Sequence, residues 1–384
     1  MVCGRAPHPQ DGAWAWLCCL SAAVCNSLHF GFTQSFGVFL PILAEVFNEN
    51  REKTAWAGSI ALFLTFLVGP VAALLSQRFS PRTVTLVSGL LCAASLLSTS
   101  FATSIVYIYF TYGVLFGTGA GCILNMGYAV ARQYFTSRYR SLTTGVIASG
   151  AGVGVIMTGP ILQAVIDAVG WRDTLRVMSG IMLIIYTDNA SPDVPPADNQ
   201  TNPSGHKTHC LETFIDCSVW NNRLFVIGAI AIFLAYLPLF VPNIHIVRFA
   251  TDLHISSDKA SWLFTYIGVT STVCRAIIGK VLDMRWVTPL QGVQISSLLM
   301  GVSIIALGSA TEYTHFVVFA VFYGVGNGIF VTTQAVFFQT SVAPSKSAMG
   351  MGMGFMTCSV AILIGPPICG KSLSSLIRHY VKIF

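Results

Sequence analysis

Residues 142–166 read LTTGVIASGAGVGVIMTGPILQAVI, an unbroken run without one charged side chain. About 20 apolar residues are enough to cross the hydrocarbon core of a bilayer as an α-helix. The bilayer core offers no water to backbone N–H and C=O groups, so each such run has to satisfy its own backbone hydrogen bonds. A helix does this, and the stretch therefore predicts a membrane-spanning helix.

The composition of the whole chain agrees with this stretch. Hydrophobic residues make up 54% of the sequence and charged residues only 9%, which is too few to cover a water-soluble protein with a polar surface. The net charge of +6 would suit a nucleic-acid partner, but the basic residues are scattered between apolar runs and form no continuous patch. We expect an all-α, polytopic membrane protein that contacts lipid and binds no nucleic acid.

Ten further apolar runs resemble 142–166 in length and polarity. The sixth run along the chain is short for a span, and the tail after Gly370 is too short and too charged to form a twelfth. We therefore expect eleven spans, with the last helix of a twelve-helix fold absent. The predicted spans are 13–43, 55–77, 83–102, 104–131, 142–166, 173–186, 222–248, 260–282, 288–310, 313–340 and 347–370.

Lysines and arginines gather in alternate turns between these spans. Loops rich in Lys and Arg tend to stay cytoplasmic, so the N-terminus is expected on the cytoplasmic side. The other turns are mixed or acidic. The basic turns carry Arg78 and Arg82, then Arg132, Arg138 and Arg140, then Lys280 and Arg285, and finally Lys346.

A polar segment at 187–221, rich in Pro, Asn, Asp and Ser, predicts a flexible cytoplasmic linker. It would divide the chain into a six-helix bundle at 1–186 and a five-helix bundle at 222–384. Asn189 and Asn199 begin glycosylation sequons in this linker. On the cytoplasmic side these would be chance matches that are never modified.

The second half of the chain repeats features of the first at one separation. Gly159-Pro160 in the fifth span matches Gly365-Pro366 in the eleventh, and Arg140-Ser141 matches Lys346-Ser347. Parallel repeats of this kind are typical of the major facilitator fold. Glycine series in corresponding spans indicate close helix packing, and the prolines weaken the helices where alternating access would bend them.

Two motifs resemble the monocarboxylate transporter family. The first enters the first span, and the second, a Tyr-Phe pair followed by basic residues, leads into the fifth. The first differs by alanine at two glycine positions, and the second by one extra residue before Leu142. The motif residues are Asp11, Gly12, Trp14 and Trp16 in the first, and Tyr134, Phe135, Arg138, Arg140 and Gly145 in the second.

The resemblance implies twelve helices in two bundles, a substrate site between them and a place in the plasma membrane. Residues 110–117, FTYGVLFG, and 240–247, FVPNIHIV, are most similar to the branch that carries aromatic amino acids and thyroid hormones. Some relatives need a single-span chaperone, so the resemblance raises such a protein as a partner. The sequence itself neither requires nor excludes it.

Arg275 is the one full charge that we place inside a predicted span. Intramembrane charges usually face a cavity or a partner, and the family keeps an arginine at this position that meets the substrate carboxylate. The alternative is a side chain that snorkels to the cytoplasmic edge. His245 is the other ionisable residue in an apolar run, and it suits either a cavity-facing role or a packed position near the outer interface.

Neutral polar residues in the spans complete the candidate substrate site, although many such residues only bridge helices. The family's proton-coupled lactate carriers keep an acidic residue at Ser271 and a lysine near Gln34, and the aromatic branch keeps an acidic residue at Asn327. Their absence argues against lactate–proton symport and favours facilitated diffusion of a larger carboxylate. The neutral candidates are Asn26, His29, Gln34, Asn125, Asn327 and Gln334.

We therefore expect a secondary transporter that moves a monocarboxylate or an aromatic amino-acid-like solute by alternating access. The sequence contains no catalytic motif, zinc pattern or cofactor motif, so an enzyme, a cofactor and a metal are not expected. A non-transporting transceptor or an inactive truncated carrier is the alternative, because the pairing carboxylates and the twelfth helix are missing. Uptake of labelled substrate separates the two.

Overall fold

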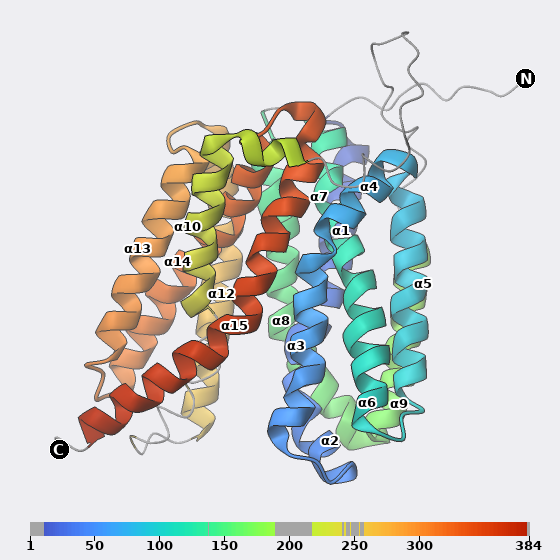
Figure 1. Ribbon diagram of the computed structural model, residues 1–384, viewed down its shortest axis with the longest axis vertical. Helices are drawn as coiled ribbons and strands as arrows, with labels where there is room; N and C mark the ends of the chain where they lie inside the picture. The colour runs from blue at the N-terminus through green and yellow to red at the C-terminus, as the bar shows by residue number, and fades with distance from the viewer. Residues whose placement is uncertain are drawn as a thin grey trace, which may run out of the picture.

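The computed structural model describes the backbone of residues 11–136, 138–188, 217–239 and 257–381, together with residues 242, 246 and 253. Every regular element in these residues is a helix (Figure 1). The first half contains α1 (Ala13–Gln34), η1 (Ser35–Val38), α2 (Leu40–Val46), α3 (Arg51–Leu67), α4 (Gly69–Arg78), α5 (Pro81–Thr99), α6 (Ile105–Ile108), η2 (Tyr109–Phe116), α7 (Gly117–Tyr134), α8 (Arg140–Val169) and α9 (Trp171–Asp188).

The second half contains η3 (Cys217–Asn221), α10 (Arg223–Leu239), α12 (Ser257–Asp283), α13 (Pro289–Leu307), α14 (Tyr313–Thr340), η4 (Pro344–Lys346) and α15 (Ser347–Val381). Most of the long helices run along one common direction, while the C-terminal part of α15 slants away from them, and the two halves lie on opposite sides of the molecule (Figure 1). The linker sequons and His245 lie outside the described residues.

The outer surface of the helices is apolar. Ile305 is 79% exposed, Leu298 70% and Ile227 64%, which suits contact with lipid chains and not with water. Eight described helices are long and apolar enough to cross a membrane, and the bent pair α3–α4 gives a ninth. α9 and α10 occupy two further predicted runs. The all-helical membrane architecture expected from the sequence is confirmed.

Three predicted spans are not single straight helices, contrary to expectation. The run 13–43 ends as a helix at Gln34 and continues through η1 into the short α2. The run 55–77 bends by 46° between α3 and α4, where Pro70 lacks the N–H that would continue the ladder. The run 104–131 contains the π-helical segment η2. Apolar length predicts a crossing but does not register such breaks.

The ends of two other spans also differ from expectation. The sixth run, predicted at 173–186, is the longer helix α9, because the charged residues Arg172 and Asp188 continue it at its two ends. The eleventh run, predicted to end at 370, continues as one helix to Val381. Charged residues lower hydropathy without breaking a helix, since Lys and Arg are good helix formers.

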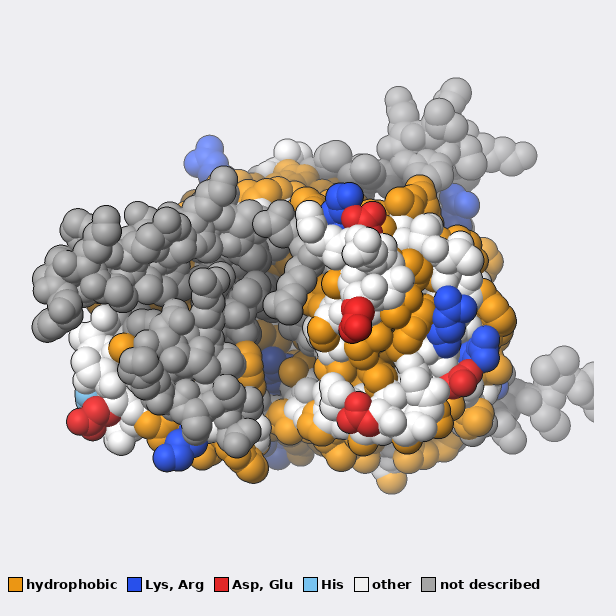
Figure 2. All heavy atoms as spheres, turned by 90° about the horizontal axis from the view of Figure 1, so that it is seen from below, with side chains coloured by type: hydrophobic (Ala, Val, Ile, Leu, Met, Phe, Trp, Pro, Cys, Tyr) orange, Lys and Arg blue, Asp and Glu red, His pale blue; other side chains and the backbone are white. Residues whose placement is uncertain are grey.

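The basic turns predicted to share one side do lie at one end of the molecule, which we call the N-terminal end. The backbone N–H of Asp11 donates to the carbonyl of Tyr134 at 3.1 Å, and α4 meets α5 at this end (Figure 1). The opposite end carries both signs of charge (Figure 2), including the ion pairs Lys53–Glu49 and Arg176–Asp173. That the N-terminal end is cytoplasmic stays a prediction.

Two seams join the halves. In the first seam α8 packs along α12, and in the second α15 packs along α3 and α4. Their contacts run from the N-terminal end toward the middle of the helices: in the first seam from Gly279 against Ser141 to Gly268 against Ile156. The molecule is therefore held closed at its N-terminal end.

Candidate functional site

The two motifs singled out in the sequence pack against each other at the N-terminal end. The Asp11 carboxylate accepts hydrogen bonds from the backbone N–H of Thr136 at 3.0 Å and from its hydroxyl at 2.6 Å. The Trp16 ring lies 5.1 Å from that of Phe135, edge to face, and Phe135 is buried. Gly12 is the N-cap residue of α1. The first motif therefore positions the second, more than a hundred residues away.

The second motif in turn closes the first seam. The ring of Tyr139 takes a cation–π contact from Arg138 at 5.3 Å and another from Lys280, on α12, at 5.6 Å. The Asp283 carboxylate accepts the backbone N–H groups of Ser141 and Leu142 at 2.9 and 2.8 Å. These are orphan donors in the first turn of α8, at the positive end of the helix dipole, and a carboxylate satisfies both needs.

Glycines let the two helices of this seam come together. A side chain at Gly145 would meet the backbone carbonyl of Arg275, and one at Gly152 would meet the side chain of Thr272. The Ser149 hydroxyl also donates to the Thr272 carbonyl at 3.0 Å. The glycine series predicted to allow close helix packing does so in this seam.

Arg275 lies inside the first seam and is only 8% exposed. Its Nη1 donates to the carbonyl of Ala148, on α8, at 2.7 Å, and its Nη2 lies 3.5 Å from Oδ1 of Asn327. That same oxygen accepts the Ser271 hydroxyl at 2.9 Å. Among the described residues Arg275 has no carboxylate partner, and its Nε is buried without any hydrogen bond.

The guanidinium of Arg275 points away from the N-terminal end. Its own backbone carbonyl faces Gly145, whereas its Nη1 reaches Ala148, one turn further along α8. This direction is opposite to snorkelling toward the N-terminal end. The side chain is instead directed at the middle of the molecule, between the two halves.

An aromatic cluster from both halves lies near this guanidinium. The ring of Phe66 is 6.3 Å from Tyr236 and 5.4 Å from Phe355, Tyr236 is 5.5 Å from Phe330, and Tyr128 is 6.1 Å from Phe355. Thr332, two residues after Phe330 on α14, donates its hydroxyl to the backbone carbonyl of Arg275 at 3.2 Å. We call these five residues the aromatic cluster. Its five rings are at most 5% exposed and pack on one another.

Other predicted site residues divide into two groups. Gln334, 2% exposed, donates to the Tyr236 hydroxyl at 2.6 Å and keeps a buried Oε1 without a hydrogen bond, so it belongs to the aromatic cluster's surroundings. Asn26 instead donates to the Ile147 carbonyl at 2.9 Å and ties α1 to α8. Asn125 bonds the Gly121 carbonyl of its own helix. Gln34 ends α1, toward the end opposite the N-terminus.

Sequence reasoning did not include Ser271 and Tyr236 among the site residues. A signal existed for Ser271, which precedes Arg275 by four residues and so lies on the same face of α12. No signal marked Tyr236, because it is one of 38 aromatic Phe and Tyr residues in the chain, 26 Phe and 12 Tyr. Among the described residues no three His, Cys, Asp or Glu side chains come close enough to hold a metal ion.

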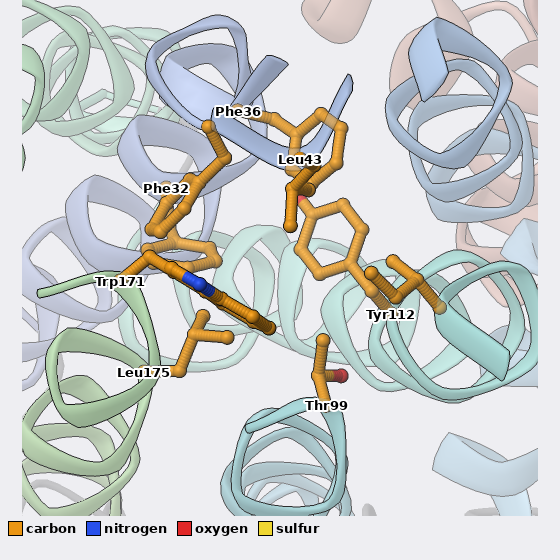
Figure 3. A pocket seen from close by; sticks show the side chains of 9 residues that line it. Phe32, Phe36, Leu43, Thr99, Tyr112, Trp171 and Leu175 are labelled. Atoms are coloured by element: carbon orange, nitrogen blue, oxygen red, sulfur yellow. The ribbon is translucent and has the colours of Figure 1, made fainter. Parts of the chain in front are cut away.

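A small cavity lies elsewhere, among side chains of the first half that come from α1, α2, η2 and α9 (Figure 3). Phe32, Phe36, Tyr112, Trp171 and Leu175 surround it. Its free volume of about 10 Å³ holds roughly one water molecule. It is therefore too small for an organic solute and is separate from Arg275.

Comparisons with known proteins agree with this architecture. The Major Facilitator Superfamily model matches residues 22–370. The chain is 30% identical to monocarboxylate transporter 4 of Gallus gallus, over 97% of this chain and 80% of that protein. It is 25% identical to monocarboxylate transporter 1 of Bos taurus, over 94% and 80%. The solved structure of the human organic anion transporter MFSD10 has a TM-score of 0.70 at 14% identity, covering 95% of this chain and 93% of that one, and shows the fold alone.

Proposed function

We propose that this chain, which belongs to the monocarboxylate transporter family of the Major Facilitator Superfamily, binds the carboxylate of its solute at Arg275. A membrane solute transporter is the function shared by these relatives. The proposal adds the substrate class, a monocarboxylate or an aromatic amino-acid-like carboxylate, and alternating access as the mechanism.

The buried guanidinium of Arg275 is the observation that carries the proposal. Burying an ion away from water costs several kcal/mol, and the described residues supply only a carbonyl and an amide oxygen in return. A planar guanidinium can hold a carboxylate with two parallel hydrogen bonds. The carboxylate of a bound solute would therefore supply the negative charge that Arg275 lacks.

The aromatic cluster supports a solute with a flat apolar body. Aromatic rings attract one another through offset or edge-to-face contacts, each contributing about 0.5–1.5 kcal/mol beyond the area buried. Phe66 and Tyr128 come from the first half of the chain, and Tyr236, Phe330 and Phe355 from the second. A solute held between them would contact both halves, as alternating access requires.

Facilitated diffusion suits the site better than proton symport. Proton coupling normally uses a buried carboxylate or histidine beside the substrate group. At the two positions where relatives keep acidic residues, this chain has Ser271 and Asn327, and they bond each other next to Arg275. Neither side chain titrates in the physiological range.

The first test replaces Arg275. Arg275→Gln should reduce uptake of labelled phenylalanine or lactate into oocytes to background, because no described side chain can replace the cation. Arg275→Lys keeps the charge but loses the planar group that can hold a carboxylate with two hydrogen bonds. Uptake at low substrate should therefore fall roughly tenfold, which corresponds to a loss of about 1.4 kcal/mol of binding free energy. Surface amount is measured in parallel.

Arg285→Lys is the matched control, because Arg285 is an exposed arginine just beyond the end of the same helix. It should transport as the wild type does. Wild-type kinetics in Arg275→Lys would remove Arg275 from the site. If the wild type itself reaches the surface and carries no carboxylate, the non-transporting alternative is correct.

The second test adds a carboxylate. In Asn327→Asp the new side chain would sit where Oδ1 of Asn327 already lies 3.5 Å from Arg275, and it would compete with the solute for the cation. Uptake at neutral pH should fall roughly tenfold. The loss should persist on mild acidification, because the neighbouring guanidinium stabilises the charged form of the new carboxylate. Wild-type uptake in Asn327→Asp at normal surface amount would argue against this placement of Asn327.

A further inference from the structure

Arg132 is a second partly buried arginine, and its partner is weak. It lies in the last turn of α7, and its Nη1 is 3.7 Å from the sulfur of Met351 on α15. The same sulfur also accepts a hydrogen bond from the side-chain amide of Gln339, on α14, at 3.5 Å. A thioether is a poor hydrogen-bond acceptor. Among the described residues this guanidinium has no carboxylate partner.

Arg140 stands at the other end of the short turn 135–139, which joins α7 to α8. It is the first residue of α8, where the helix dipole adds further positive potential. Its Nε is buried without a hydrogen bond among the described residues. Asp283, the carboxylate at this helix end, already uses one oxygen for each of two backbone N–H groups. Within the part of the chain that the structure describes, the pair of arginines therefore has no anionic partner.

The pair lies between Arg275 and the N-terminal end. Arg140 precedes Ala148, whose carbonyl holds Arg275, by eight residues of one helix, a rise of about 12 Å. Arg132, Arg140, Gln339 and Met351 come from α7, α8, α14 and α15. A solute that leaves Arg275 toward the N-terminal end would therefore pass these four helices.

We infer that Arg132 and Arg140 form a second anion site, which receives the solute carboxylate when the N-terminal end opens. Opening separates α15 from α7 and so frees Arg132 from Met351. The unbranched, polarisable methionine side chain can then contact the apolar part of the solute. This inference rests on the proposed function, since the ligand is the same carboxylate.

A site that forms only in the state open at the N-terminal end affects binding from that side alone. The test therefore compares half-saturating concentrations of labelled phenylalanine for efflux and for influx in oocytes, with the full chain. Arg132→Gln and Arg140→Gln should each raise the ratio of the N-terminal-side value to the opposite-side value roughly tenfold. Arg132→Lys should keep most of the wild-type ratio, because an anion also binds a lysine.

Arg138→Gln is the control. Arg138 lies in the turn between α7 and α8, is exposed and contacts the ring of Tyr139. Its replacement should leave the ratio of the two half-saturating concentrations unchanged. The same rise in Arg138→Gln would assign the effect to the general charge of this end and overturn the inference. An unchanged ratio in both arginine variants, with normal surface amount and active wild type, would overturn it while leaving the role of Arg275 intact. Absence of transport in the wild type overturns both proposals.

Discussion

The two seams between the halves occupy corresponding places in the internal repeat but are built differently. The first seam carries charge, because Asp283 caps α8 and Lys280 contacts Tyr139 across it. The second seam relies on shape. A Cβ at Gly69 would lie 2.5 Å from the carbonyl oxygen of Gly352, so the two backbones are in direct contact.

The clearest difference is at one pair of matching positions. Arg78 matches Arg285 at an offset one residue greater than that of the other matching pairs, which sets Ser76 against Asp283. The Ser76 hydroxyl donates to the Ala73 carbonyl of its own helix at 2.7 Å, whereas the Asp283 carboxylate crosses to the other half. Both seams contain closely packed glycines, but charged contacts are added to this packing in the first seam. The two matching positions therefore share a place in the fold but make different contacts.

Among the changes that test this comparison of the seams, the largest effect is expected from replacing a glycine of either seam by alanine. Gly145→Ala places a Cβ against the Arg275 carbonyl, and Gly352→Ala places one against the backbone of Gly69. Neither neighbour is a flexible side-chain end, so the N-terminal end should fail to close and uptake should fall by a factor of ten or more. A factor of ten in the population of the closed state corresponds to about 1.4 kcal/mol.

Gly180→Ala is the matched control, because nothing lies near a Cβ at that helical position. It should leave uptake unchanged and favour the helix slightly. Normal uptake in Gly145→Ala at normal surface amount would mean that the first seam has more room than the structure gives it. The same result in Gly352→Ala alone would mean that only the first seam controls closure.

A smaller effect is expected from removing the charge of the first seam. Asp283→Asn keeps one acceptor but loses the charged cap of α8, and loss of a cap typically costs about 1 kcal/mol. The closed state should be depopulated roughly fivefold. Half-saturation for uptake from the opposite side should rise by up to the same factor, because the binding-competent fraction falls.

Ser76→Ala is the corresponding change in the second seam, and it should leave half-saturation unchanged because Ser76 bonds only within α4. Equal effects of the two substitutions would contradict the difference drawn between the seams. A fall in surface amount for Asp283→Asn, with unchanged half-saturation, would assign the carboxylate to folding.

The structure confirms the apolar helices and the packing role of the first-seam glycines, both predicted from sequence. Length and polarity predict them because the bilayer leaves the backbone few alternatives. The sequence predicts Arg132 in a turn, because its apolar run ends where charged residues begin. It instead lies in the last turn of α7 under Met351. The bend at Pro70 and the π-helical segment were also missed, since local breaks depend on what neighbouring helices can satisfy.

By itself, the sequence determined that this chain lies in a membrane as packed helices, and that its one mid-span cation has no acidic residue at Ser271 or Asn327. Hydropathy and residue identity are enough for these conclusions. The tertiary structure alone decided that Asp11 supports the loop of the second motif and that Ser271 and Asn327 meet beside Arg275. It also decided that the two seams differ. These contacts join residues tens to more than a hundred positions apart, and only the packing of particular side chains selects them.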